Sequence, residues 1–242
     1  SDQVIAVSNY TKNEAISITG NQKIATIPNF VNTTEFFPKS TSKCRKNFQL
    51  NQSDKILLSL SRLVKRKGHD IIIRAIQIVK KKIPEIKYLI AGTGDNPYNK
   101  ILEQLVNDLG LQSHVHFLGY IEENKKLLLY NASDIYIMNS LDTDEKGDSE
   151  GFGITFLEAN ACGKPVIGTN VGGISDAIKN NVNGILVKPN DMNATAEAII
   201  RLFSNKILYQ KLSSNGLLRV NTQFSLSHVG EQYQQIISSL CP

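Results

Sequence analysis

Residues 56–91 read ILLSLSRLVKRKGHDIIIRAIQIVKKKIPEIKYLIA, and this stretch decides the fold class. It begins with a short apolar run, residues 56–60, which is typical of a strand buried on both faces. Apolar residues then recur at helical spacing through residues 70–82, and Pro84 ends that pattern. A second apolar run, residues 88–91, predicts another strand. A strand, a helix and a strand in this order indicate two parallel strands joined by a helical crossover.

The same alternation continues along the rest of the chain. We expect further strands at residues 115–118, 135–138, 165–168 and 184–187, and helices at 98–109, 122–130, 153–162, 174–179, 191–203, 207–220 and 226–240. Ahead of residue 56, we expect strands at 4–7 and 23–27, a helix at 9–17, and a loop or linker over the polar residues 32–54. The pattern predicts an α/β protein with a Rossmann-like parallel sheet and helices on both faces.

Composition narrows the classes of function. The chain has 242 residues, of which 41% are hydrophobic, and a formal net charge of +5. This mild basic excess suits a polyanionic ligand or an anionic membrane surface, and it is too weak to indicate nucleic acid. The three cysteines are odd in number and widely spaced, so they predict neither a disulfide framework nor a metal site and fit a reducing cytoplasm.

Membrane-spanning and targeting segments were sought in the sequence next. No stretch approaches the roughly 20 apolar residues that a membrane-spanning helix needs, and the N-terminus does not resemble a signal peptide. The chain enters a predicted strand directly after Ser1, without an initiator Met. We therefore expect that a segment N-terminal to this chain is missing.

Ligands of parallel α/β sheets bind at the carboxyl ends of the strands. Function is therefore expected in the loops that follow Leu60, Ala91, Leu118 and Met138. In the first loop, Arg62 and Lys67 offer a fork donor and a point cation that suit a diphosphate. Ordinary surface cations ahead of a helix would give the same spacing. The glycines at residues 92–94 are a weaker signal, because a tight turn from strand to helix also uses them.

Residues 148–158, DSEGFGITFLE, are the most informative segment for function. Gly151 and Gly153 stand where a helix opens after a polar loop, and amides at a helix start suit a phosphate. Glu150 is expected before this helix, free to face a sugar, whereas Glu158 lies inside it and suits a ribose. The alternative is that both carboxylates only stabilise the helix or face solvent. The apolar surroundings of Glu158 disfavour this alternative, because a carboxylate there needs a partner.

Other kinds of chemistry have little support in the sequence. His114 and His116 alternate on a predicted strand, and two histidines without further ligands do not make a metal site. No Gly-x-Ser-x-Gly elbow of a serine hydrolase is present. No Gly-x-Gly-x-x-Gly follows the first strong strand, so a dinucleotide oxidoreductase is disfavoured.

Residues 150–167, EGFGITFLEANACGKPVI, resemble the Glu-x7-Glu motif of retaining glycosyltransferases with two Rossmann-like domains, known as glycosyl transferases group 1. Residues 61–70 resemble the diphosphate loop of that family, and residues 91–94, 117–121 and 172–173 also fit. The resemblance runs in order from residue 2 to about residue 240. The family usually has Gly after the pair Pro28-Asn29 and Asp soon after, where this chain has Phe30 and Asn32. That departure touches the interdomain hinge.

The resemblance implies a role for each matching residue. Arg62 and Lys67 would hold the donor diphosphate, Glu158 the ribose, and Ile121 would lie beside the base. The remaining donor-site residues implied are Gly94, Glu150, Gly151, Phe152, Gly153, Ile154 and Thr155. Glu150, Arg62 and Lys67 would act in catalysis. No cofactor and no metal are implied, because the two cations and the helix terminus would stabilise the diphosphate.

The implied protein is the C-terminal, donor-binding half of a hexosyltransferase of cell-envelope polysaccharide biosynthesis. It would take a UDP- or GDP-type sugar and transfer the hexose to a glycan or a lipid-linked acceptor. Residues 1–40 would be the end of the N-terminal domain and a linker, 41–222 the donor domain, and 223–242 a C-terminal helix. An N-terminal acceptor domain or a partner chain would complete the enzyme; alternatively, the chain is a binding module that is inactive alone. The location would be cytoplasmic, with peripheral contact at the inner face of a membrane by analogy.

Overall fold

The structure is a computed structural model that describes residues 3–94, 96–142 and 148–240. The strands are β1 (Val4–Ala6), β2 (Ile24–Thr26), β3 (Lys55–Leu60), β4 (Ile86–Ala91), β5 (Val115–Gly119), β6 (Ile135–Ile137), β7 (Val166–Thr169) and β8 (Gly184–Val187). The helices are α1 (Asn9–Thr19), α2 (Thr41–Lys46), α3 (His69–Val79), α4 (Asn96–Asp108), α5 (Glu123–Ala132), α6 (Ile154–Ala161), α7 (Ile174–Ala177), α8 (Met192–Ser204), α9 (Lys206–Gln223) and α10 (Leu226–Leu240). A short 3₁₀ turn, η1 (Lys65–Lys67), precedes α3.

The main sheet has six parallel strands in the order β5-β4-β3-β6-β7-β8. The predicted fold class, an α/β protein with a Rossmann-like parallel sheet, is therefore confirmed. The chain leaves β3 towards one edge of the sheet and later returns at β6 to build towards the other edge. Ligands of open α/β sheets bind where the direction changes in this way, outside the carboxyl ends of the strands.

Each face of the sheet carries its own hydrophobic core, because successive strand residues point to opposite sides. Leu57 and Ile90 face a core that includes residues of α3, α4 and α8. Ile56 and Leu58 face the other core, which includes residues of α5, α6 and α7. Burying each of these apolar side chains stabilises the fold by roughly 1.5–3 kcal/mol. The two cores hold the carboxyl ends of the strands in fixed positions.

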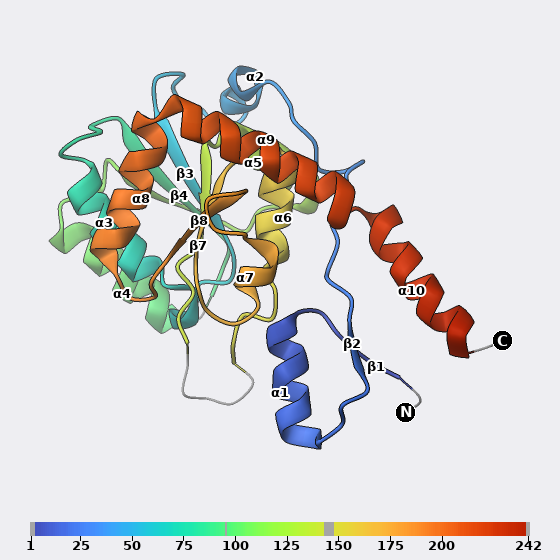
Figure 1. The fold of residues 1–242 in the computed structure, drawn as a ribbon. Coiled ribbons are helices and arrows are strands. Elements are labelled where there is room, and N and C mark those ends of the chain that lie inside the picture. Colours follow the sequence, from blue (N-terminus) through green and yellow to red (C-terminus); the bar gives the residue numbers. More distant parts are fainter. Residues whose placement is uncertain (1–2, 95, 143–147, 241–242) are drawn as a thin grey trace.

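Strands β1 and β2 form a separate two-stranded parallel sheet with α1 beside it (Figure 1). This unit contacts the rest of the chain at α7, where the backbone N–H and the side-chain amide of Asn9 donate to the carboxylate of Asp176, over 3.0 and 2.7 Å. It is also joined at Thr11, whose methyl group lies near Gly151. The predicted division of the chain at residues 40 and 222 stays a prediction.

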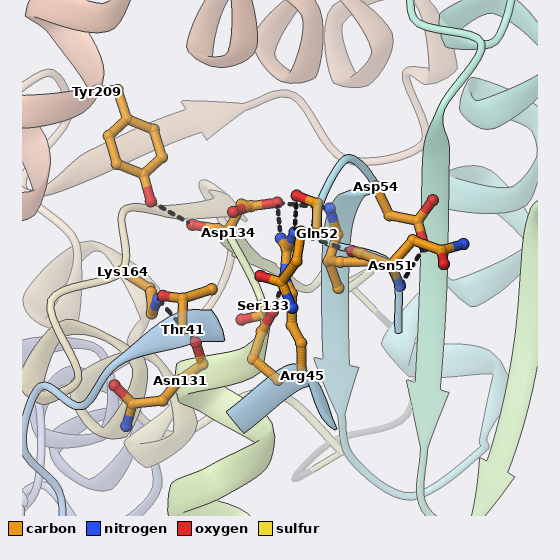
Figure 2. A network of polar contacts seen from close by, with 12 residues as sticks. Thr41, Arg45, Asn51, Gln52, Asp54, Asn131, Ser133, Asp134, Lys164 and Tyr209 are labelled. Atoms are coloured by element: carbon orange, nitrogen blue, oxygen red, sulfur yellow. Dashed lines mark hydrogen bonds and ion pairs between the residues drawn. The ribbon is translucent and has the colours of Figure 1, made fainter. Parts of the chain in front are cut away.

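The expectation of a loop over residues 32–54 was wrong in part, because this segment contains α2. The helix has only six residues and a polar sequence, so it lacks the periodic apolar pattern that reveals longer helices. Tertiary contacts fix it instead. Figure 2 shows the buried Arg45 of α2 bonded to the carboxylate of Asp134, 2.8 Å away, and to the carbonyl oxygen of Gln52 at 2.7 Å. The same carboxylate accepts the N–H of Ile56 at the start of β3.

Among the described residues, none of the helices combines the length and the hydrophobicity that a transmembrane span requires. Cys44 and Cys162 are buried and unpaired, while Cys241 lies outside the described residues.

Candidate functional site

The loops that follow β3 and β6 meet at the carboxyl edge of the sheet, where the strand order changes direction. The backbone N–H of Leu141 donates to the carbonyl oxygen of Arg66 over 2.8 Å. Gly68 packs against the other loop so closely that a β-carbon there would lie 1.9 Å from the carbonyl oxygen of Asn139. Gly68 also has φ +62°, so both its backbone conformation and its surroundings favour glycine.

A pocket of about 410 Å³ opens at this junction. Its lining residues are Val7, Asn29, Leu60, Ser61, Arg62, Arg66, Lys67, Glu150, Gly151, Phe152, Gly153, Ile154 and Thr155. The pocket therefore brings Arg62 and Lys67 from one loop to Glu150 and the start of α6. Among the residues expected at the site, Gly94, Ile121 and Glu158 do not line this pocket. Arg66 and the upstream residues Val7 and Asn29 do line it, although sequence reasoning gave them no role there.

The start of α6 faces this pocket without a side-chain cap. Gly153 occupies the N-cap position with φ +92° and, as a glycine, makes no side-chain cap bond to the first amides of the helix. A β-carbon at Gly153 would lie 2.6 Å from the ring of Phe156, which explains the glycine by packing as well as by φ. The amides of Ile154 and Thr155 lie in the first turn, where helix N–H groups have no carbonyl partner within the helix and attract anions.

Gly172 and Gly173 brace the backbone that leads into α6. The N–H of Gly173 donates to the carbonyl oxygen of Glu150 over 2.7 Å. A β-carbon at Gly172 would lie 2.3 Å from the carbonyl oxygen of Glu150, and one at Gly173 would lie 2.0 Å from that of Gly151. The sequence marked these two glycines as part of the family pattern, and the structure gives the physical reason.

Glu150 lines the pocket, and its carboxylate is paired with cations in this structure; its expected role towards a sugar stays a prediction. Its carboxylate is bonded to the ammonium group of Lys67 and lies 3.2 Å from the guanidinium of Arg66. Arg66 also contacts the carboxylate of Asp148 at 2.9 Å. The side chains of Lys67 and Glu150 are only 11% and 14% exposed. Burial lowers the pKa of Lys67, and the neighbouring Glu150 carboxylate offsets part of that effect.

Glu158 lies inside α6, away from Glu150, as the seven-residue spacing predicts. Its carboxylate accepts a hydrogen bond of 2.5 Å from the hydroxyl of Tyr130, which is the partner that its apolar surroundings require. Burial raises the pKa of Glu158, and the bond from Tyr130 acts in the opposite direction. No signal in the sequence singled out Tyr130.

A buried hydrogen-bond network lies next to the loop that carries Arg62. His69 is fully buried at the start of α3, and its ring bonds to the hydroxyls of Ser61 (3.1 Å) and Tyr88 (2.9 Å). Tyr88 in turn lies 2.8 Å from the hydroxyl of Ser59 in β3. Burial lowers the pKa of His69 to about 4, so the ring is neutral at pH 7. This hydrogen-bond network fixes the direction in which the loop leaves β3.

Gly94 and Ile121 lie on the neighbouring loops. Gly94 forms an isolated parallel β-bridge with Leu63. A β-carbon at Gly94 would lie 2.0 Å from the carbonyl oxygen of Leu63. It therefore supports the loop that carries Arg62. Ile121 follows β5 and packs against the core cluster that contains Tyr130. Asp95, next to Gly94, lies outside the described residues.

Within the described part of the chain, no group of three or more His, Cys, Asp and Glu side chains is arranged to hold a metal ion. His114 bonds to the carbonyl oxygen of Ile86 over 2.9 Å, which indicates a structural role.

Comparisons with known proteins agree with the fold. The model of the family Glycosyl transferases group 1 matches residues 40–219. N-acetyl-alpha-D-glucosaminyl L-malate synthase of Bacillus anthracis is 30% identical over 98% of this chain and 59% of its own length. This chain thus spans about three fifths of that relative.

Two solved structures are also similar. Anabaena Alr3699/HepE, crystallised in complex with UDP, has a TM-score of 0.89 and 25% identity over 99% of this chain and 64% of that one. The C-terminal domain of a glycosyl transferase group 1 family protein (LpcC) from Francisella tularensis has a TM-score of 0.72 and 29% identity, over 81% of this chain and 99% of that domain. The matched residues include both loops of the pocket and the whole of α6, and by this match the chain belongs to the glycosyl transferases group 1 family.

Proposed function

We propose that this chain is the donor-binding part of a retaining hexosyltransferase that uses a nucleotide-diphosphate sugar. The observation that carries the proposal is the meeting of Arg62, Lys67 and the uncapped start of α6 in one pocket at the strand-order change. Two cations and free helix amides are the groups that neutralise a diphosphate. The UDP in the similar HepE structure supports a nucleotide of this type.

In the proposed reaction, the bond between the anomeric carbon and the diphosphate oxygen breaks, and the diphosphate keeps the electron pair. The acceptor hydroxyl forms its new bond on the same face of the sugar and passes its proton to the departing diphosphate oxygen. Arg62, Lys67 and the α6 amides stabilise the negative charge that develops on the leaving group. Glu150 faces the donor sugar once the diphosphate is bound, and Glu158 holds the ribose.

We further propose that an acceptor-binding part, on the same polypeptide or on a partner chain, completes the enzyme. The shared length with the relatives supports this proposal, because this chain matches only 59% of the Bacillus protein. By itself the chain would then bind a nucleotide sugar and transfer nothing. The acceptor would be a glycan or a lipid-linked molecule, and contact with the inner face of a membrane would follow from a lipid acceptor.

The first test is calorimetric titration of this chain with UDP, GDP, ADP and NADH. We expect one nucleoside diphosphate to bind and NADH not to bind. Ligand at 100 times its dissociation constant should add about 2.7 kcal/mol to the free energy of unfolding, which is visible in a melting curve. Arg62→Ala should weaken binding at least tenfold, because one charge-assisted contact is worth about 1.5–3 kcal/mol.

The matched control is Arg74→Ala, which removes an exposed arginine of α3 that lines a different groove. Its nucleotide affinity should equal that of the wild type. Failure of every nucleoside diphosphate to bind, or equal binding by Arg62→Ala, would refute the donor site. For the complete enzyme, activity that survives EDTA would support catalysis without a metal, and the anomeric configuration of the product by NMR would test retention.

A further inference from the structure

We propose that Tyr130 is a positioning residue that holds the Glu158 carboxylate in the orientation that binds the donor ribose. The inference rests on the proposed function, because it assumes that Glu158 receives the ribose hydroxyls. It adds a residue on a different helix to the nucleotide site, at a position for which the sequence offered no signal.

The contact that carries the proposal joins two helices. Tyr130 lies on α5, Glu158 lies on α6, and the Tyr130 hydroxyl donates to Oε2 of Glu158 over 2.5 Å. One carboxylate oxygen is thus occupied by the tyrosine. Within the described part of the chain, no protein group bonds to the other oxygen, Oε1, which is the oxygen left for a ligand hydroxyl.

The ring of Tyr130 is held firmly, so its hydroxyl points in a fixed direction. The residue is fully buried. Phe36 packs edge-on against the ring with a centroid distance of 5.8 Å, and Tyr136 packs against it at 5.7 Å. Both contacts restrict the orientation of the ring. A hydrogen bond from a ring packed on two sides can orient a carboxylate that would otherwise rotate.

Tyr130 also favours the charged form of Glu158. Burial raises the pKa of this carboxyl, and the Tyr130 hydroxyl is the largest influence that lowers it. Lys126 lowers it further, whereas Glu123 and Glu35 raise it. A charged carboxylate accepts stronger hydrogen bonds than a neutral carboxyl group does. Loss of the hydroxyl would therefore weaken the bonds from Glu158 to the ribose as well as misdirect them.

The measurable consequence is discrimination between ribose and 2′-deoxyribose. A site built to bind a ligand hydroxyl penalises an analogue that lacks it, because the protein group is left without its partner. We expect the wild-type chain to bind UDP, or GDP, at least tenfold more tightly than the 2′-deoxy form, since a hydrogen bond to a charged group is worth about 1.5–3 kcal/mol.

The test compares Tyr130→Phe with Tyr209→Phe in titrations of both pairs of nucleotides. Tyr209 is a matched control, because its hydroxyl also donates one hydrogen bond, to the carbonyl oxygen of Asp134 over 2.9 Å (Figure 2). Asp134 directly precedes β6, at the end of the strand opposite to the pocket. Tyr130→Phe should reduce the preference for ribose to about threefold or less. Its affinity for UDP should also fall more steeply than that of the wild type as the pH is lowered. Tyr209→Phe should keep the wild-type preference.

Glu158→Gln distinguishes a failure of the positioning role of Tyr130 from a failure of the donor site. If Glu158→Gln abolishes the ribose preference and Tyr130→Phe keeps it, the positioning role is overturned while the donor site stands. If the wild type binds UDP and GDP no better than their 2′-deoxy forms, the positioning role is also overturned. If no nucleoside diphosphate binds the wild type at all, the proposed function itself fails.

Discussion

Glu150 is paired with Lys67, one of the two cations that the proposed function assigns to the donor diphosphate. Its carboxylate bonds to Lys67, and both side chains are largely removed from water. Leaving either buried charge without a partner is costly, so each charge needs the other or another group of opposite charge. A bound diphosphate could replace Glu150 as the partner of Lys67. Arg66, 3.2 Å from Glu150, would then keep the carboxylate in the pocket.

Glu150→Gln should therefore bind UDP or GDP more tightly than the wild type, by roughly three- to tenfold, or about 0.7–1.4 kcal/mol. The substitution keeps the size of the side chain and removes the negative charge that competes with the diphosphate for Lys67. Calorimetric titration of the chain measures the effect. Glu122→Gln is the control, since it removes a carboxylate from an exposed ion pair with Lys125. An unchanged or weaker affinity in Glu150→Gln would show that Glu150 does not compete.

At the scale of elements, the loop between β3 and α3 depends on a neutral histidine. The ring of His69 links Ser61 at the start of this loop to Tyr88 in β4. Its pKa is about 4 in the folded chain, against 6.5 for an ordinary histidine. The unfolded chain thus binds a proton more readily than the folded chain does. Stability from this group is complete above pH 6.5 and is lost as the pH falls towards 4.

We expect His69 to lower the free energy of unfolding by roughly 2 kcal/mol between neutral pH and about pH 5. Urea unfolding of the wild type and of His69→Gln at both pH values tests this, because the variant lacks the titrating ring. His228→Gln, on the exposed side of α10, is the control and should retain the wild-type pH dependence. Equal pH dependence in wild type and His69→Gln would contradict the burial of a neutral ring.

At the scale of the whole molecule, stability is distributed unevenly. Helix α3 has seven buried residues, whereas α1 has none and α10 has only Val229. Strands β1 and β2 form a sheet of only two strands, which is marginal without further packing. Segments with few buried apolar contacts open at a lower free energy than the core does.

Native-state hydrogen exchange should therefore show two classes of amides. Those of β3, β4 and α3 should exchange only through global unfolding, while those of α1 and α10 should exchange through local opening, with free energies lower by several kcal/mol. Denaturant dependence of the exchange rates distinguishes the two routes. Equal protection of α10 and α3 would mean that the chain opens as one cooperative unit.

The parallel α/β fold could be predicted from the amino-acid sequence, because the signals for its strands and for most of its helices are local. Apolar runs and helical spacing predicted every strand and all helices but α2, and the residues 61–68 and 148–155 could be assigned to one edge of the sheet. Only the tertiary structure decided which side chains are partners. Arg66 and Glu150 are 84 residues apart, Arg45 and Asp134 are 89 apart, and Tyr130 meets Glu158 across two helices. Such pairs leave no periodic trace, because they depend on how the loops and helices pack, so the ion pair at Lys67, helix α2 and the tyrosine beneath Glu158 became visible only in the folded chain.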